Sequence, residues 1–270
     1  MTDIHRIGFI GAGAMSEAIM EGLIRSGEFS PASISVVGKT GARAARLSER
    51  FNVEHHTSVK SIAANNEMLC LCVKPRDLHN LARELEGVSL EGKLLVSTLA
   101  GVNLKVLREH FPTPYLVRSI PNISSAINEG VTMWAAEGLP DELHELVRRF
   151  LQTLGVSLQV VHEDHIDLGS PISGAAPAFM GIFAEALVDA AVFLGLPREM
   201  AAQLVLQSLK GSCELIQQEN FDAHLIRQRV TSPGGLTAAC MATLEARGFR
   251  SALLDAVIAG HAKTKELGQR

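Results

Sequence analysis

The sequence contains only four cysteines, and none of them stands in the CxxC spacing of a zinc site or a redox dithiol. Cys70 and Cys72 fall on one face of a predicted strand, where we expect burial, and the other two are Cys213 and Cys240. His55-His56 and His162-x-x-His165 have no clear set of additional ligands. We therefore expect no metal, no disulfide framework and a reducing cytoplasmic location.

Long runs of like charge are also missing. The 25 basic and 29 acidic residues are interspersed and give a net charge of -4, which disfavours nucleic acid and anionic membrane surfaces as partners. Met1 to Arg6 run straight into a strand-like segment, and no positively charged region leads into an apolar signal stretch. Export is therefore not expected. The most apolar predicted helix, Ala178 to Leu194, contains Glu185 and Asp189, and we interpret it as a buried helix rather than a membrane span.

The chain is rich in apolar residues. They make up 47% of the sequence, which is high for a soluble protein, and a chain of 270 residues suffices for two domains of ordinary size. Part of the apolar surface is then expected to be buried between subunits, as a homodimer or a higher homo-oligomer.

The first part of the chain alternates apolar strand-like runs with helical stretches, the pattern of βαβ units around a parallel sheet. Between the first two strands, Met15, Ile19 and Leu23 recur at helical spacing, and Gly27 stands where that helix should end. The predicted strands are Ile7-Ile10, Ile34-Val37, Leu69-Val73, Leu94-Leu99, Tyr115-Ile120, Val131-Ala135 and Ser157-Val161.

Beyond Asp164 the strand signals disappear and helical periodicity takes over. We predict helices over Ala178-Leu194, Arg198-Gln218, Leu236-Arg247 and Ser251-Lys265. The first of these is apolar around most of its circumference, and a second subunit is a natural way to enclose it. The predicted organisation is an α/β domain over 1–164 and a helical domain over 165–270, with a boundary at the change from strands to helices.

The first motif of chemical interest is Gly8-Phe-Ile-Gly11-Ala-Gly13-Ala-Met-Ser16, which leaves a strand and opens a helix. Gly11 permits the tight turn, and Gly13 lets the backbone approach a pyrophosphate beside the helix N-terminus. A plain strand-helix turn has a similar form, but the position at the first βα junction favours dinucleotide binding.

The end of the second strand, Val36-Val37-Gly38-Lys39-Thr40, lacks the acid with which NAD sites usually bind the ribose hydroxyl. Lys39, Thr40 and Arg43 offer donors to a 2′-phosphate instead, which favours NADPH while leaving NADH possible. The alternative is that Lys39, Thr40 and Arg43 are solvated loop residues that bind no ligand.

Two further segments end strands at the expected crevice, namely Leu71-Cys-Val-Lys-Pro75 and Ser97-Thr-Leu-Ala-Gly101. Either can line a cofactor or simply end a strand.

The segment Thr231-Ser-Pro-Gly-Gly-Leu-Thr237 precedes a predicted helix. Its glycine amides can bind a small carboxylate, while a plain helix start, with Ser232 as cap and Pro233 in the first turn, remains the alternative.

Along nearly its whole length the chain resembles the pyrroline-5-carboxylate reductase family. The segments that carry the resemblance are GFIGAGAMSEAI from Gly8, CVKP from Cys72, STLAGV from Ser97, RSIPN from Arg118, SGAAPAF from Ser173, LGLPRE from Leu194, VTSPGG from Val230 and GFRSALLDAV from Gly248.

The resemblance implies an α/β fold, with a Rossmann-type doubly wound sheet followed by an all-helical dimerisation domain. It also implies NAD(P)H-dependent reduction of 1-pyrroline-5-carboxylate to L-proline. The cofactor contacts it implies are Gly11, Gly13, Ala14, Met15, Lys39, Thr40, Val73, Lys74, Pro75, Ala100, Gly101 and Asn122. The substrate contacts it implies are Ser232, Gly234, Gly235 and Thr237.

The chain departs from the family pattern at three places beside the expected crevice, namely Ala14, Ile123-Ser125 and Ala175-Ala176. Several of these changes remove polar groups. They motivate one alternative, a dinucleotide-binding regulatory or competence-related paralogue with little reductase activity.

The predicted helical domain has little acid-base machinery, which suits an imine better than a carbonyl because an iminium carbon is already electrophilic. We expect Thr237 to hydrogen-bond the ring nitrogen while the glycine amides hold the carboxylate. A β-hydroxyacid dehydrogenase is a further alternative, but it needs a lysine early in the central long helix, where this chain has Phe179, Met180 and Phe183.

Overall fold

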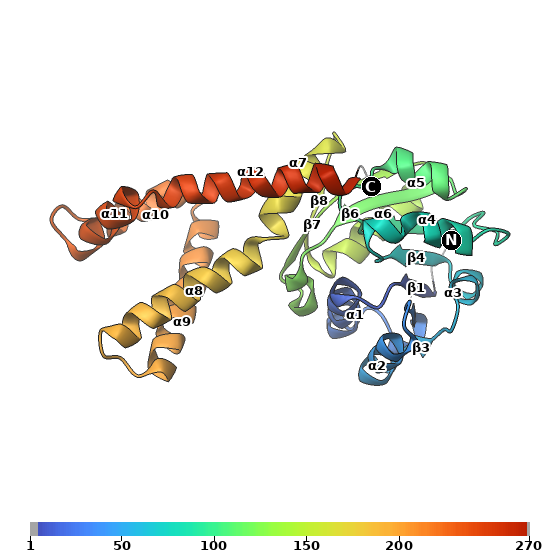
Figure 1. Cartoon of the computed structure of the whole chain (residues 1–270), viewed down its shortest axis with the longest axis horizontal. Helices are drawn as coiled ribbons and strands as arrows, with labels where there is room; N and C mark the ends of the chain where they lie inside the picture. Colours follow the sequence, from blue (N-terminus) through green and yellow to red (C-terminus); the bar gives the residue numbers. More distant parts are fainter. Residues whose placement is uncertain (1–4, 269–270) are drawn as a thin grey trace. The chain divides into compact units, whose positions relative to one another are not determined.

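A computed structural model of the chain describes residues 5–268, so the expectation for Met1 to Arg6 lies largely outside the described residues. The chain divides into two compact units (Figure 1). The first contains the residues up to Ala175 and those from Gly260 onward, and the second is Ala176–Ala259.

The first unit is built on one eight-stranded sheet with the order β3-β2-β1-β4-β5-β6-β7-β8 (Figure 1). β1 lies between β2 and β4 and is parallel to both, with Phe9 opposite Val36 on one side and Cys70 on the other. The strands are β1 Ile7–Ile10, β2 Ile34–Val37, β3 Glu54–His55, β4 Met68–Leu71, β5 Leu94–Ser97, β6 Tyr115–Ile120, β7 Gly130–Glu137 and β8 Gly155–Gln159.

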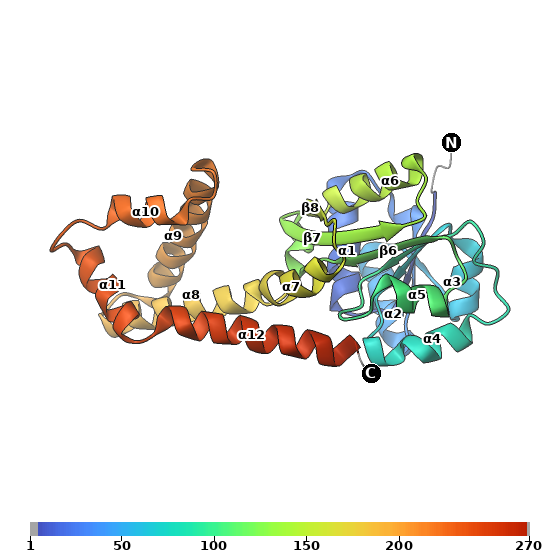
Figure 2. The same cartoon turned by 90° about the horizontal axis from the view of Figure 1, so that it is seen from above.

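Helices cover both faces of this sheet, as Figure 2 shows from above. Side chains of α1 (Ala14–Ser26), α2 (Gly41–Phe51) and α6 (Asp141–Gln152) share one buried cluster with Phe9 and Val36. Side chains of α3 (Val59–Asn65), α4 (Leu78–Glu84), α5 (Leu104–His110) and α7 (Asp164–Ser173) share a second cluster with Ile10 and Leu71. A sheet covered on both faces explains why its central strands are apolar without alternation.

The expectation of a parallel sheet is wrong at one pair, because β7 runs antiparallel to β6, with Arg118 opposite Ala135. The connection between them carries only a short 3-10 helix over Ile123–Ile127. A parallel return needs a crossover of a dozen or more residues, usually a helix, so this shorter connection reverses the chain direction.

The seven predicted strands are all present, with shifts of a few residues at their ends. The strand that the sequence does not reveal is β3, which is only two residues long and polar. It pairs with β2 at the edge of the sheet. Because it is not buried on both faces there, its residues need not form an apolar pattern.

α7 stays on the sheet of the first unit. A Cβ placed on Gly169 would lie 2.1 Å from the sulfur of Met133 on β7, so the helix crosses this strand closely. The buried guanidinium of Arg118 on β6 pairs with Glu163, beside the start of α7, and with Asp167 within it. The compact unit therefore extends to residue 175, beyond the point at 164 where the sequence changes from strands to helices.

The second unit is helical, with α8 (Ala176–Phe193), α9 (Arg198–Gln218), α10 (Ala223–Val230), α11 (Leu236–Ala246) and the start of α12 (Phe249–Gly268). Its buried core is small and contains Val188, Ala201 and Val205. Large apolar side chains such as Ile182 and Phe193 are exposed. Within residues 5–268, the stretch Asp164–Phe193 is long and apolar enough to cross a membrane by length and composition alone, a test that core helices of soluble proteins also pass.

Candidate functional site

A cleft of about 710 Å³ opens in the first unit beyond the carboxyl ends of β1, β2 and β4. Ligands of open α/β sheets bind at this edge. Six of the residues predicted for cofactor binding line the cleft, namely Gly11, Gly13, Lys39, Thr40, Val73 and Lys74.

Gly11 forms the turn at the end of β1. Its φ is +110°, and a Cβ at this position would lie 2.6 Å from the carbonyl oxygen of Cys72. Its N–H donates to the carbonyl oxygen of Val37 over 2.9 Å, which joins the ends of β1 and β2. Only glycine fits this conformation and this contact.

The helix that follows begins at the cleft, where Gly13 is a lining residue. Gly13 is the N-cap of α1 and has no side chain, so no side chain caps the first turn, and the hydroxyl of Ser16 donates to the carbonyl oxygen of Gly11. A Cβ on Gly13 would meet nothing within the protein closer than 4.0 Å. Uncapped N–H groups and the helix dipole make this end of α1 suited to an anion such as a pyrophosphate.

The residues after β2 provide positive charge on the same cleft. Thr40 is the N-cap of α2 and makes no side-chain capping bond, so this helix N-terminus is open as well. Lys39 and Arg43 line the wall beside it. The Lys39 ammonium lies 3.3 Å from a carboxylate oxygen of Asp77, which belongs to the wall beyond β4.

The thiol-bearing Cys72 lines the cleft, and Cys70 lies two residues earlier, on β4, in the buried core. Burial raises the pKa of the Cys72 thiol, and hydrogen bonds with Thr98 and Ser16 offset only part of that effect. The pKa of Cys70 is raised further, first by burial and then by the neighbouring Cys72. Both thiols are therefore protonated at neutral pH and unsuited to act as nucleophiles.

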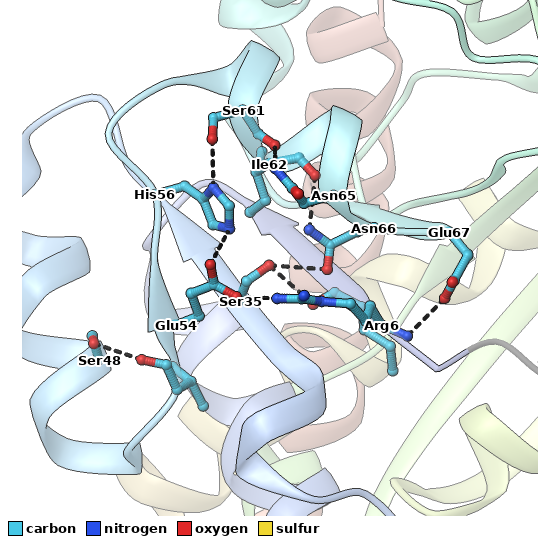
Figure 3. Close-up of polar contacts among 12 residues, drawn as sticks. Arg6, Ser35, Ser48, Glu54, His56, Ser61, Ile62, Asn65, Asn66 and Glu67 are labelled. Carbon is cyan, nitrogen blue, oxygen red and sulfur yellow. Dashed lines mark hydrogen bonds and ion pairs between the residues drawn. The ribbon is translucent and has the colours of Figure 1, made fainter.

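The segment between β3 and α3 contributes Thr57, Ser58 and Val59 to the wall of the cleft, and the preceding residue, His56, belongs to a polar cluster (Figure 3). The His56 ring is buried, with Nδ1 2.8 Å from the Ser61 hydroxyl and Nε2 3.2 Å from Glu54. Ser58 caps α3 by accepting from the N–H of Ser61. The cluster fixes the β3-α3 connection beside the cleft.

The other predicted cofactor residues lie outside the lining of this cleft. Ala14 and Met15 begin α1, and Pro75 begins the 3-10 helix that precedes α4. Ala100 and Gly101 follow β5, and a Cβ on Gly101 would lie 2.6 Å from the carbonyl oxygen of Thr264 in α12.

Asn122 is buried after β6. Its amide donates to the carbonyl oxygen of Ser173 at 3.2 Å and accepts from the N–H of Val131 at 3.3 Å. The structure thus gives Gly101 and Asn122 packing and hydrogen-bonding roles of their own.

The predicted substrate residues lie together in the second unit: Ser232, Gly234 and Gly235 are in the loop before α11, and Thr237 is in its first turn. The Gly235 N–H donates to the Ser232 carbonyl oxygen at 3.0 Å, and Gly234 has φ +69°. Pro233 and Gly234 thus occupy the central positions of a tight turn, where Pro followed by Gly is typical of type II. The expectation that Ser232 caps the helix and Pro233 enters its first turn is wrong, because Gly235 is the N-cap and no side chain caps α11.

Sequence reasoning missed the far wall of the cleft, which includes Asp77, Asn80 and Glu84. These residues follow β4 in the 3-10 turn and in α4, where their polar side chains look like ordinary helix surface. The abrupt end of the strand at Lys74-Pro75 was the available signal, but it does not specify which later side chains face the cleft.

The doubly wound sheet, the glycine turn and the open helix N-terminus define a protein of the dinucleotide-binding oxidoreductase class. Two family models match, "NADP oxidoreductase coenzyme F420-dependent" over residues 6–101 and "Pyrroline-5-carboxylate reductase dimerisation" over residues 163–267. Pyrroline-5-carboxylate reductase of Synechocystis sp. is 36% identical over 98% of this chain and 99% of its own length. The Escherichia coli protein of the same name is 30% identical, with 98% of each covered.

Solved structures agree with these relatives. Plasmodium falciparum pyrroline carboxylate reductase with NADP bound superposes with a TM-score of 0.87, at 27% identity and over 99% of each chain. The Coxiella burnetii pyrroline-5-carboxylate reductase gives a TM-score of 0.82 at 28% identity, with 98% of this chain and 99% of that one covered. The chain belongs to the pyrroline-5-carboxylate reductase family.

Proposed function

We propose that this protein reduces 1-pyrroline-5-carboxylate to L-proline with NADPH, in proline biosynthesis. The observation that carries the proposal is the glycine cradle from Gly11 to the open first turn of α1, in a chain of this family. The cradle fits a dinucleotide because Gly11 permits the turn, Gly13 leaves open space at the cleft, and no side chain caps the first turn of α1. When bound, NADPH supplies the hydride that the reaction needs.

The residues after β2 bind the adenosine end in this proposal. Lys39, Thr40 and Arg43 donate to the 2′-phosphate, which accounts for a preference for NADPH over NADH. Further along the crevice, Val73, Lys74 and Pro75 position the nicotinamide half, together with Ala100, Gly101 and Asn122.

The loop before α11 binds the imino acid. The N–H groups of Gly234 and Gly235 and the Ser232 side chain hold the carboxylate at a helix N-terminus that no side chain caps. Thr237, on the first turn of α11, hydrogen-bonds the ring nitrogen and so orients the imine carbon. Positioning suffices because a protonated imine accepts hydride without leaving an alkoxide to be protonated.

The protein acts as a cytoplasmic homodimer in this proposal. The support is the exposed apolar surface of the second unit, where Ile182, Leu206 and Ile258 are each more than half exposed in the single chain, at 69%, 61% and 58%. A surface of this kind is normally covered by a partner, and a second copy is the partner expected for a dimerisation domain.

The decisive assay measures NADPH oxidation with synthetic pyrroline-5-carboxylate. It is run beside NADH, and beside a β-hydroxyacid with NADP+ in the reverse direction. Turnover with the imine alone supports the proposal. Cofactor binding without turnover would indicate the regulatory paralogue that Ala175 and Ala176 suggest, and turnover of the hydroxyacid would indicate a dehydrogenase.

Thr237→Ala is expected to lower kcat by about 10- to 100-fold and to change the KM for NADPH little, because the hydroxyl orients the substrate rather than the cofactor. Thr243→Ala is the matched control. It lies on the same helix, is exposed, and its hydroxyl donates to the Ala239 carbonyl oxygen at 3.1 Å. Wild-type kcat in Thr237→Ala would contradict the assigned role.

A further inference from the structure

The cleft contains an ion pair that the proposed function does not use. Lys39 follows β2 and Asp77 lies in the 3-10 turn after β4, so the pair joins two different walls of the cleft. The ammonium and the carboxylate oxygen are 3.3 Å apart. The same Lys39 is a proposed ligand of the 2′-phosphate.

This ion pair contributes little to the fold. The Lys39 side chain is 83% exposed and that of Asp77 is 27% exposed. Exposed pairs contribute little to stability, since solvent screens them and ordering a lysine costs side-chain entropy. The effect of Asp77 is therefore expected in the electrostatics of the cleft, where a carboxylate opposes any anion that approaches Lys39.

We infer that Asp77 is a specificity-determining residue that moderates the preference for a 2′-phosphorylated cofactor by competing with the phosphate for Lys39. The inference rests on the proposed cofactor site. A 2′-phosphate must replace the carboxylate beside the ammonium, whereas the neutral 2′-hydroxyl of NADH has no such competition. Asp77 acts through Lys39 and so narrows the difference in affinity between the two cofactors.

The test measures binding of adenosine 2′,5′-bisphosphate and of adenosine 5′-monophosphate by calorimetry at low salt. These probes differ at the 2′ position and require no imine substrate. Asp77→Asn should bind the bisphosphate about three- to tenfold more tightly, as expected for loss of one charge at ion-pair distance in a solvated site. Binding of the monophosphate should change by less than about twofold. The gain should shrink at 0.5 M salt, where screening is stronger.

Two comparisons make the result specific. Glu84→Gln removes the same charge from the same wall, and Glu84 does not pair with Lys39, so its effect on the bisphosphate should be smaller. In a Lys39→Ala background, Asp77→Asn should lose most of its effect, because the two residues act as a coupled pair. Asp77→Ser also removes the carboxylate and should likewise tighten binding of the bisphosphate. Unchanged melting temperatures of the variants would show that the fold is kept.

An unchanged ratio of the two dissociation constants in Asp77→Asn would overturn the inference, as would an equal gain in Glu84→Gln. If wild type bound neither probe, both this inference and the proposed cofactor site would fail. If the ratio changed as expected but no pyrroline-5-carboxylate were reduced, only the proposed function would be contradicted.

Discussion

At the scale of single residues, two glycines in one turn have different reasons to be glycine. Gly11 is required by the fold, since its φ of +110° and its approach to Cys72 exclude a side chain. Gly13 has an ordinary φ of -89° and free space around it within the protein. The requirement for glycine at position 13 therefore comes from what enters the cleft.

Gly11→Ala should lower the free energy of unfolding by about 2 to 4 kcal/mol, through a positive φ and a backbone clash. Gly13→Ala should change that free energy by less than about 1 kcal/mol but raise the KM for NADPH at least about tenfold, because a methyl group would stand where the phosphates approach. Urea unfolding and steady-state kinetics on both variants separate the two effects. A Gly13→Ala enzyme with an unchanged KM would show that the phosphates bind elsewhere.

The sequence reveals residues that belong to a local motif, but not residues whose role depends on contacts formed only in the folded chain. Gly11 and Gly13 are visible because a glycine motif at a βα junction has few other uses. Asp77 is invisible because its importance depends on Lys39, which is distant in sequence and reaches it only across the folded cleft. Gly101 was predicted as a cofactor contact, and its close approach to α12 appears only when the chain folds.

At the scale of elements, the strands were the easiest features to predict, because burial on both faces produces continuous apolar runs. The sequence predicts neither the direction of β7 nor the edge strand β3. The first depends on the short 121–129 connection and the second on a partner at the sheet edge. An apolar pattern identifies a strand but does not give its pairing direction.

A buried cation, Arg118, links α7 to the sheet in addition to their apolar contacts. Arg118 is 1% exposed and pairs with both Glu163 and Asp167, while Glu163 also accepts from the N–H of Leu104 at the start of α5. Arg118 therefore links β6 with α7 and, through Glu163, with the start of α5.

Arg118→Ala should lower the free energy of unfolding by about 3 kcal/mol, since it leaves two partly buried carboxylates without their cation. Arg148→Ala is the control. It removes an arginine that pairs with Glu145 on the surface of α6, where the guanidinium lowers the pKa of the carboxyl but solvent screens the pair. Thermal or urea unfolding of the two variants should differ clearly, and equal stabilities would mean that Arg118 is not what holds α7 in place.

At the scale of the whole molecule, the two units differ in how completely they bury their apolar residues. The first has two large clusters on a covered sheet, whereas the second buries only Val188, Ala201 and Val205 in its own core. α8 has apolar side chains around most of its circumference, yet Val188 is its one buried residue. A helix of this composition is stable in water only when other surfaces cover it.

Ile182→Asp tests whether a second copy of this chain covers the apolar surface of α8. Ile182 lies on α8 and is 69% exposed in the single chain, so an aspartate there costs a lone chain little. In a dimer it would place an unpaired carboxylate in an apolar interface, which is expected to weaken association at least about 100-fold. Light scattering coupled to size exclusion, over a range of concentrations, should show a monomer with little reductase activity, and Ile182→Leu should remain dimeric and active. A fully dimeric Ile182→Asp protein would place the interface on another face of the helices.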